Sequence, residues 1–433
     1  MDDKHVEQVM LRGMTRGDRD SIESSFRDDP DPQRSLAMIV DITGTAPHYN
    51  AALSRALSDH PEVVFRTSPY FADRNAFLDS ALKTDFLETA ARLADRWPTV
   101  RHKRGLWKTI QLQGYLSGWR EVLRDLVLTR TPVLHVQWFK LPFLDVWQMR
   151  RVQRRGVRVA YTVHNALPHG DRRESVRRTY QRLYRQADAL IVLSRFVGQQ
   201  IIEWVDDEVS DKIHVIEHGV LDLACPMPSR TDARIELNLE PDAEVALFMG
   251  GIRAYKGITD LIEALAIASR NRPKLRLIIA GSPMESFAPY AAQIERLSLS
   301  GIVHAYPQYV SERFKAALYA AADIAVMPHR DPSQSAMGLE ALGAGKPIIV
   351  TRGGGLVELV DEAINGYTVP IRDPAALAQA LTRFFDRPPV QQESMAAASL
   401  SLGRERFAWS KVARKHLDLY RQLAAKASIS RGI

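Results

Sequence analysis

Cysteine and long apolar runs are both scarce in this sequence. The single cysteine, Cys225, excludes a disulfide framework within one chain and a multi-cysteine zinc site. No stretch approaches the ~20 apolar residues that a membrane-spanning helix requires. The charged N-terminal segment 1–20 also lacks the apolar core of a signal peptide. We therefore expect a cytoplasmic protein, with peripheral association at the inner membrane face as the alternative.

Common nucleotide and metal motifs are absent as well. The sequence has neither a Walker A motif nor a dinucleotide-binding Gly-x-Gly-x-x-Gly, and no Asp-x-Asp motif stands in a metal-binding context. We expect no metal and no cofactor. The 433 residues are otherwise ordinary, with 45% hydrophobic and 25% charged side chains. This length and composition indicate two or three globular domains.

Positive charge is concentrated in residues 101–160. This stretch holds 13 Lys or Arg but only 3 acidic residues, and Trp107, Trp119, Trp138 and Trp147 are interleaved with them. Such a surface suits an anionic membrane leaflet or a nucleic acid. It is also typical of a solvated helical face with buried tryptophans. No helix-turn-helix, zinc-finger or RNP pattern accompanies it, so we expect no nucleic-acid partner.

Predicted strands and helices alternate along the chain, which indicates parallel sheets covered by helices on both faces. Apolar runs predict strands at 35–42, 61–68, 132–139, 157–164, 187–194, 212–219, 244–251, 275–282, 301–308, 322–329, 346–353 and 366–371, with helices between them, including one at 73–96. The patterns divide the chain into a flexible lead-in (1–34), an N-terminal domain (35–222), an irregular linker (223–243), a C-terminal domain (244–408) and a closing helix (409–433) that packs back on the N-terminal domain.

Polar residues follow several of the predicted strands. Gly44 follows the first strand, and His164 ends the strand at 157–164. Arg253 and Lys256 lie in a loop between a strand and a helix. Two cations beside a helix N-terminus make a diphosphate site, because the helix adds free N–H groups and a partial positive charge. The alternative is a pair of ordinary surface cations.

A second candidate anion site lies within residues 329–355. The segment SQSAMG (333–338) precedes a helix, and small or hydroxyl residues at a helix start leave backbone N–H groups open for an anion. Glu340 follows in the first two turns and suits a ribose, because one carboxylate can accept hydrogen bonds from both hydroxyls. The alternative for Glu340 is an exposed helix charge.

These segments resemble glycosyltransferase family 4, a group of retaining enzymes with the GT-B architecture. The matching segments are TVHNALPH (162–169), VIEHG (215–219), LFMGGIRAYKG (247–257), LEALGAGKPII (339–349) and INGYTVPIRDPAALAQAL (364–381). The resemblance implies an α/β fold of two Rossmann-like, doubly wound domains facing across a cleft. The C-terminal domain would bind the nucleotide-sugar and the N-terminal domain the acceptor.

The resemblance also implies roles for individual residues. Lys256 matches the lysine that binds the donor diphosphate. The family's usual arginine falls at Gly251, so Arg253 is the nearest substitute. His164 matches the histidine over the transferred sugar, and Gly44 lies in the loop beneath the donor. Glu340 matches the second glutamate of the family's Glu-x7-Glu motif, which holds the ribose.

The first glutamate of that motif is missing, because its position is Pro332. Asp331 is one candidate to replace it at the sugar hydroxyls. The backbone N–H groups of a short segment are the other candidate, and the one that we favour: Gln334, Ser335, Ala336 and Met337. This departure leaves the identity of the sugar open.

The predicted function is that of a retaining hexosyltransferase in polysaccharide or glycolipid biosynthesis. The donor would be a UDP- or GDP-sugar and the acceptor a saccharide or a lipid-linked saccharide. His164, Asp331, Arg253 and Lys256 are the expected catalytic residues, with the two cations neutralising the leaving diphosphate. The alternatives are a transferase with a soluble small-molecule acceptor and a non-catalytic GT-B protein that binds sugar nucleotides.

Overall fold

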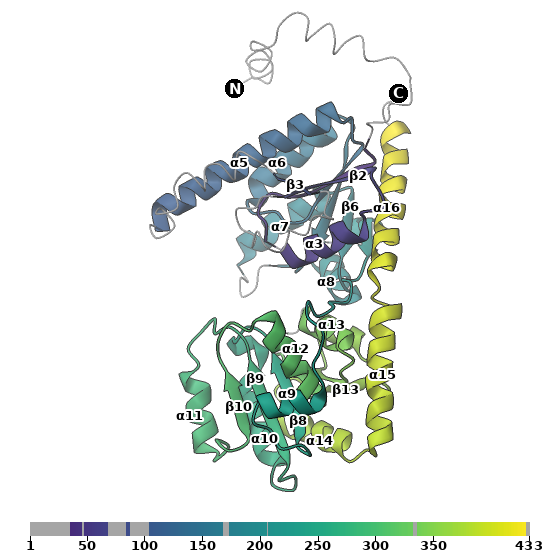
Figure 1. The fold of residues 1–433 in the computed structure, drawn as a ribbon. Coiled ribbons are helices and arrows are strands. Elements are labelled where there is room, and N and C mark those ends of the chain that lie inside the picture. Colours follow the sequence, from purple (N-terminus) through teal and green to yellow (C-terminus); the bar gives the residue numbers. More distant parts are fainter. Residues whose placement is uncertain are drawn as a thin grey trace, which may run out of the picture.

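The computed structural model describes residues 35–45, 47–67, 84–86, 104–167, 173–205, 207–331 and 336–429. Within these ranges the chain forms two parallel β-sheets, each covered by helices on both faces (Figure 1). The predicted α/β class with two doubly wound domains is confirmed. The predicted lead-in, residues 1–34, lies outside the described residues. No helix in the described ranges is both long and apolar enough to cross a membrane.

The N-terminal domain contains a seven-stranded sheet of order β3-β2-β1-β4-β5-β6-β7. Its strands are β1 (Ala37–Asp41), β2 (Val63–Thr67), β3 (Thr84–Phe86), β4 (Val133–Val136), β5 (Arg158–Val163), β6 (Ala189–Val192) and β7 (Ile213–Val215). Its helices are α3 (Pro47–Ala56), α5 (Arg104–Leu128), α6 (Pro142–Gln153), α7 (Glu174–Gln186) and α8 (Arg195–Val205), followed by the 3-10 helix η3 (Asp207–Lys212).

Strand β3 corrects the helix predicted at 73–96. Residues Thr84–Phe86 pair in parallel with β2, with Thr84 opposite Phe65. The pairing adds backbone hydrogen bonds at the sheet edge, and such tertiary contacts override a local helical pattern. The expectation of a continuous helix was therefore wrong at these three residues.

The C-terminal domain contains a six-stranded sheet of order β10-β9-β8-β11-β12-β13. Its strands are β8 (Glu244–Met249), β9 (Leu275–Ala280), β10 (Val303–Tyr306), β11 (Ile324–Met327), β12 (Ile348–Thr351) and β13 (Gly366–Val369). Its helices are α9 (Arg230–Glu236), η4 (Ala254–Lys256), α10 (Ile258–Ala268), α11 (Ala288–Arg296), α12 (Glu312–Ala321), α13 (Ala336–Gly343), η5 (Gly354–Leu359), α14 (Pro374–Phe385) and α15 (Pro389–Glu405).

Strand β8 shows why these sheets are buried on both faces. Val245 and Leu247 belong to the core beneath α9, α12 and α13, whereas Ala246 and Phe248 belong to the core beneath α10 and α14. Alternate side chains of a strand point to opposite faces, so an unbroken apolar run fills both cores.

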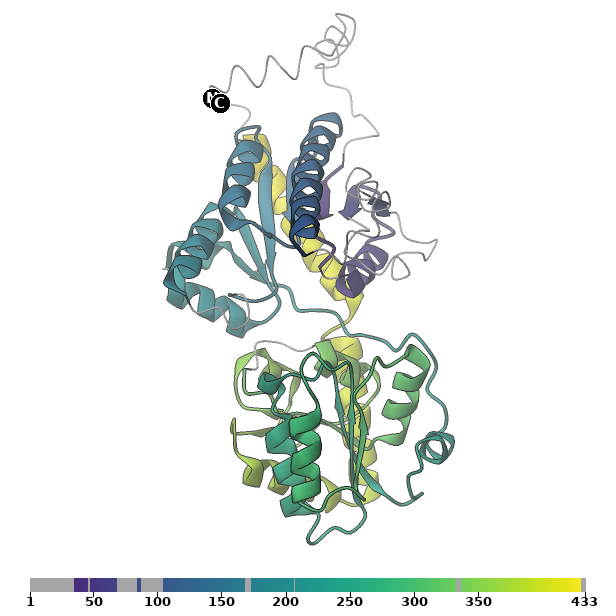
Figure 2. The same ribbon diagram turned by 90° about the vertical axis from the view of Figure 1, so that its left-hand side faces the viewer.

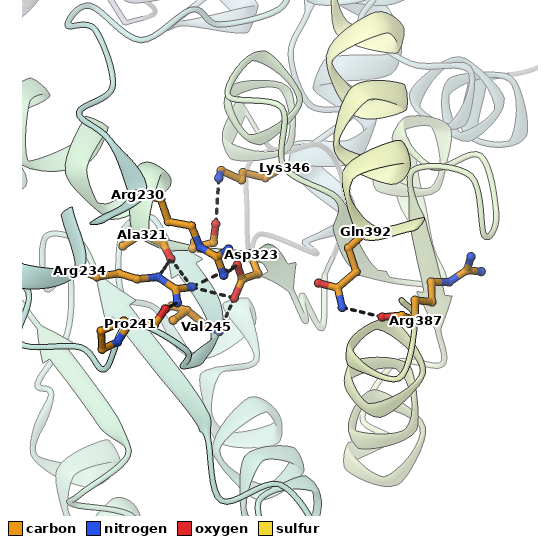
Figure 3. A network of polar contacts seen from close by, with 10 residues as sticks. Arg230, Arg234, Pro241, Val245, Ala321, Asp323, Lys346, Arg387 and Gln392 are labelled. Atoms are coloured by element: carbon orange, nitrogen blue, oxygen red, sulfur yellow. Dashed lines mark hydrogen bonds and ion pairs between the residues drawn. The ribbon is translucent and has the colours of Figure 1, made fainter. Parts of the chain in front are cut away.

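The segment expected as an irregular linker, 223–243, is partly helical. Helix α9 packs into the C-terminal core, and Arg234 is buried with a guanidinium nitrogen 3.0 Å from Asp323 Oδ2 (Figure 3). Arg230 adds a second contact at 2.6 Å to the same carboxylate. Because this ion pair fixes α9 to the C-terminal domain, the passage between the domains is shorter than expected.

Two chain segments cross between the domains beside each other. The N–H of Val220 donates to the carbonyl of Phe407 at 2.7 Å, and Trp409 Nε1 donates to the carbonyl of Val220 at 2.8 Å. Helix α15 lies on the C-terminal domain, and α16 (Trp409–Ile429) continues along the N-terminal domain (Figures 1 and 2). There α16 packs against α3 and the face of the sheet that carries Ala37 and Ile39.

Candidate functional site

The strand order reverses at one place in each sheet. It switches between β1 and β4 in the N-terminal sheet and between β8 and β11 in the C-terminal sheet. Loops at the carboxyl ends of strands beside such a switch point form the crevice where α/β proteins bind ligands. Gly44 follows β1, Arg253 and Lys256 follow β8, and Asp331 follows β11. The topology therefore places these predicted residues at the two switch points.

The loop that contains Gly44 is held by Asp41, a fully buried residue. Asp41 Oδ1 accepts hydrogen bonds from the N–H of Thr43 at 3.0 Å and of Gly44 at 2.8 Å. Asp41 Oδ2 accepts from Asn50 Nδ2 at 2.6 Å, which ties the loop to α3. Gly44 has a φ of 58°, a value that is strained for most other residues. Asp41 and Asn50 were not predicted as site residues. The sequence does offer one signal, a carboxylate at the end of an apolar strand just before a glycine-containing loop.

His164 lies at the carboxyl end of β5 among aromatic rings. Its ring centroid is 5.1 Å from that of Trp138 and 5.4 Å from that of Tyr49. Burial lowers the pKa of His164 to about 3, with His218 as a smaller cause and a hydrogen bond to the main chain of Gln137 as an opposing one. Among the described residues, Nε2 of His164 has no hydrogen-bond partner. The imidazole is thus neutral at pH 7, and its Nε2 is a buried polar atom that no described residue satisfies.

His218 and Trp409 complete this ring cluster and were not predicted as site residues. The centroid of His218 lies 4.8 Å from that of Tyr49 and 5.6 Å from that of Trp409, the first residue of α16. Burial lowers the pKa of His218 to about 4, and its Nδ1 lies 2.6 Å from the carbonyl oxygen of Gly219. The only sequence signal for it was a His-Gly pair at a strand end. Trp409 comes from the far end of the chain, so no local pattern could indicate it.

In the C-terminal domain, glycines draw the loop after β8 close to its neighbours. A Cβ at Gly257, where φ is 71°, would lie 1.8 Å from the carbonyl oxygen of Pro328. A Cβ at Gly250 would lie 3.3 Å from Met337 Cγ, so this loop approaches the start of α13. Gly251, where the family arginine was expected, faces Met284 in the loop after β9 instead.

Lys256 is the most perturbed cation of this loop. Burial, together with the smaller effect of the Arg253 charge, lowers its pKa to about 8. Its Nζ lies 5.4 Å from the ring centroid of Tyr255. Close by, burial and the charge of Lys256 hold the pKa of His329 well below its usual range, so that imidazole adds no charge. An anion placed here would raise the pKa of Lys256 again, because it stabilises the charged ammonium.

The structure describes only part of the predicted segment before α13. Gln334 and Ser335 lie outside the described residues. Ala336 begins α13 and is exposed, and Met337 packs partly against the C-terminal core. Asp331 is exposed at the end of the preceding described segment. The choice between Asp331 and the backbone N–H groups therefore stays a prediction.

Glu340 is buried, so its alternative interpretation as an exposed helix charge is wrong. Lys315 Nζ lies 2.9 Å from Glu340 Oε1, and the Tyr319 hydroxyl donates to Oε2 at 3.2 Å. Both partners come from α12, and neither was predicted. The carboxylate is thus held in place on α13, near the loop that carries Lys256.

Two family models match the chain. The model described as Glycosyltransferase Family 4 matches residues 49–221, and the model described as Glycosyl transferases group 1 matches residues 229–399. This chain belongs to glycosyltransferase family 4. The two matched ranges correspond to the N-terminal and C-terminal domains of the fold.

Relatives in this family carry one recurring name. The D-inositol 3-phosphate glycosyltransferase of Saccharomonospora viridis is 30% identical over 291 residues, which are 62% of this chain and 66% of the relative. The protein of that name from Streptomyces scabiei is 30% identical over 247 residues, which are 55% of this chain and 54% of the relative. The matches thus span less than two thirds of the relatives' length.

Solved structures of low sequence identity share the whole fold. Sucrose-phosphate synthase from Thermosynechococcus elongatus has a TM-score of 0.69 at 21% identity and covers 91% of this chain and 100% of its own. Anabaena HepE in complex with UDP has a TM-score of 0.68 at 16% identity and covers 89% of this chain and 99% of its own. The predicted GT-B architecture is confirmed by these neighbours.

The C-terminal candidate site combines two cations with one paired carboxylate. Among the described residues, no group of three or more His, Cys, Asp or Glu side chains is placed to hold a metal ion. Lys256 and Arg253 lie in one loop, and the nearby Glu340 is paired with Lys315. The arrangement suits a diphosphate with an adjoining ribose.

Proposed function

We propose that this protein is a retaining hexosyltransferase that uses a nucleoside diphosphate sugar. The observation that carries the proposal is the loop after β8, which holds the half-buried Lys256 and the exposed Arg253 and approaches the start of α13 at Gly250. Positive charge fixed in such a loop stabilises the negative charge that develops on a leaving diphosphate. Neutral His164, whose buried Nε2 has no partner among the described residues, would accept a hydrogen bond from a hydroxyl of the transferred sugar.

The reaction would proceed between the two domains. Glu340 would hold the ribose, and Lys256 and Arg253 would hold the diphosphate. The acceptor hydroxyl would attack the anomeric carbon from the face that the diphosphate leaves, which retains the configuration. The paired crossings at Val220 and Trp409 would serve as a short hinge, and closure about it would exclude water from the donor.

A UDP-sugar is the preferred donor and a GDP-sugar the alternative. The structural neighbour HepE was solved with UDP and with UDP-glucose, which supports uridine. The test is a thermal-shift series with UDP, GDP and ADP, because a ligand stabilises the fold in proportion to its occupancy. Stabilisation by GDP and not by UDP would reassign the base of the donor to guanine.

Two acceptor classes are supported by different observations. The relatives named for D-inositol 3-phosphate support a soluble small-molecule acceptor. The exposed Phe143 and Trp147 of α6, with arginines in the last turn of the same helix, support a saccharide on a lipid carrier, in polysaccharide or glycolipid synthesis. Release of nucleoside diphosphate with members of each class would decide between them, and Lys256→Ala is the inactive control.

The same assay tests the non-catalytic alternative. A transferase releases nucleoside diphosphate only when donor and acceptor are both present, and NMR of the anomeric proton reports retention. Tight binding of a donor with no release, across both acceptor classes, would overturn the proposed activity and favour a sugar-nucleotide-binding protein.

A further inference from the structure

Helix α6 presents an unusual outer face. Phe143 is 79% exposed and Trp147 is 50% exposed, and they lie four residues apart, so they share one side of the helix. Arg150 and Arg154 continue the same side and are exposed, and Arg151 stacks on Trp147 at 5.6 Å from the ring centroid. The only acidic residue of α6 is Asp145, which is buried.

The opposite side of α6 is fixed firmly to the domain. Asp145 accepts a hydrogen bond from the Tyr115 hydroxyl of α5 at 2.5 Å and another from the N–H of Leu141 at 2.8 Å. Met149 and Val152 are fully buried in the same core. Since α6 is anchored in this way, its exposed aromatics are displayed by a rigid element.

The N-terminal end of α6 adjoins the candidate site. The helix begins at Pro142, a few residues after Trp138, whose ring lies 5.1 Å from that of His164. The exposed aromatics lie at this end and the arginines towards the other end. A flat surface placed against the outer face of α6 would therefore lie next to the N-terminal side of the crevice, where the acceptor is proposed to bind.

We propose that the outer face of α6, defined as Phe143, Trp147, Arg150, Arg151 and Arg154, docks on an anionic lipid bilayer. Arginines attract anionic headgroups, and Phe and Trp rings enter the interface, which is the pattern of helices that lie in a membrane surface. Nucleic acid fits this face less well, because an exposed Phe at a helix start makes no phosphate contact. The biological role of this docking rests on the proposed function, since a bilayer would bring a lipid-linked acceptor to the crevice.

The test is flotation of the full chain with vesicles of phosphatidylcholine and phosphatidylglycerol, compared with phosphatidylcholine alone. We expect binding to the anionic vesicles only, weakened by salt. Arg150→Glu/Arg154→Glu should lower the affinity at least about 30-fold, and Phe143→Ser/Trp147→Ser about tenfold or more. Matched controls on α15, Arg404→Glu and Val390→Ser, alter an exposed cation and an apolar residue that is 75% exposed, and should bind normally.

Protein that stays in the buffer at low salt with anionic vesicles would overturn the inference. Equal losses in the α15 controls, or tighter binding to a DNA duplex than to vesicles, would overturn it too. Thermal unfolding of each variant verifies that it is folded. Nucleoside diphosphate release with a soluble acceptor reports the proposed function separately, so the two can fail independently.

Discussion

The ammonium of Lys315 lies 2.9 Å from Glu340 Oε1, so the carboxylate expected to bind ribose is already paired. Tyr319 donates to the other oxygen at 3.2 Å. Each carboxylate oxygen can accept more than one hydrogen bond, so a ribose diol can be added to these partners. Lys315 thus fixes the orientation of the Glu340 carboxylate, and in the proposed function it would position that carboxylate for the ribose.

Replacing Lys315 by Met should weaken both the fold and nucleotide binding. The change leaves a buried carboxylate with one partner fewer, which typically costs about 1–3 kcal/mol of the free energy of unfolding. We expect nucleoside diphosphate affinity to fall about tenfold, since the freed Glu340 loses its fixed orientation. Urea unfolding and calorimetric titration measure the two effects.

Glu312→Gln is the matched control, because Glu312 also contacts Lys315 at 2.9 Å but is 40% exposed. Exposed ion pairs contribute about 0–1 kcal/mol, so this variant should resemble the parent protein. Equal effects of the two variants would show that Lys315 does not act through Glu340.

Diphosphate binding should weaken as the pH rises above about 8, the pKa of Lys256 in the free protein. A diphosphate binds the charged ammonium, and binding therefore requires proton uptake once Lys256 is neutral. The loss should approach tenfold per pH unit. Calorimetry of UDP between about pH 7 and 9.5 measures it, with Lys256→Arg as the control, because a guanidinium stays charged throughout this range. Parallel pH profiles for the two proteins would contradict the assignment.

The lowered pKa of Lys256 also makes the free energy of unfolding depend on pH. The folded pKa of Lys256 lies below the ordinary value of 10.5, so the unfolded chain binds more protons between about pH 8 and 10.5. The contribution of Lys256 to the free energy of unfolding therefore rises with pH across this window. Removing the side chain with Lys256→Met should flatten that rise, as measured by urea unfolding at several pH values.

The sequence predicted the parts of the site that follow single strands. Lys256 and Gly44 could be found because a loop between a strand and a helix has local signals. Lys315 and Trp409 could not, since each looks like an ordinary helical residue and gains its role from elements far away in the sequence. Strand β3 was missed for the same reason, because its pairing partner β2 and not its own composition makes it a strand.

Glu358 links the domains, and its neutralisation should loosen that link. Its carboxylate, in η5 of the C-terminal domain, accepts hydrogen bonds from the N–H groups of Arg195 at 3.2 Å and Phe196 at 3.0 Å at the start of α8. A negative charge at a helix N-terminus contributes about 0.3–1 kcal/mol. We expect Glu358→Gln to speed hydrogen exchange at these two amides.

The control for this contact is Glu362→Gln. Glu362 bonds Thr368 within the C-terminal domain and is 52% exposed, so its neutralisation should leave α8 unchanged. Unchanged protection at Arg195 and Phe196 in Glu358→Gln would show that the carboxylate does not hold the domains together.

Gly219→Ala should disturb the hinge. A Cβ at this position would lie 2.3 Å from the indole ring of Trp409, closer than any ordinary contact. The indole cannot shift freely, because its Nε1 donates to the carbonyl of Val220 at 2.8 Å and its ring packs against Tyr49 and His218. Overpacking of this kind costs about 1–3 kcal/mol of the free energy of unfolding.

Gly301→Ala provides the comparison, because a Cβ there would meet no atom within 4 Å. This control should be neutral or slightly stabilising, since alanine restricts the unfolded chain. Trp409→Leu should recover part of the loss in the Gly219→Ala background, because the smaller side chain leaves room for the methyl group. Urea unfolding of the parent, of the single variants Gly219→Ala and Trp409→Leu and of the double variant measures the cycle. Equal free energies of unfolding for Gly219→Ala and Gly301→Ala would contradict the prediction. They would show that the indole of Trp409 can move aside at no measurable cost.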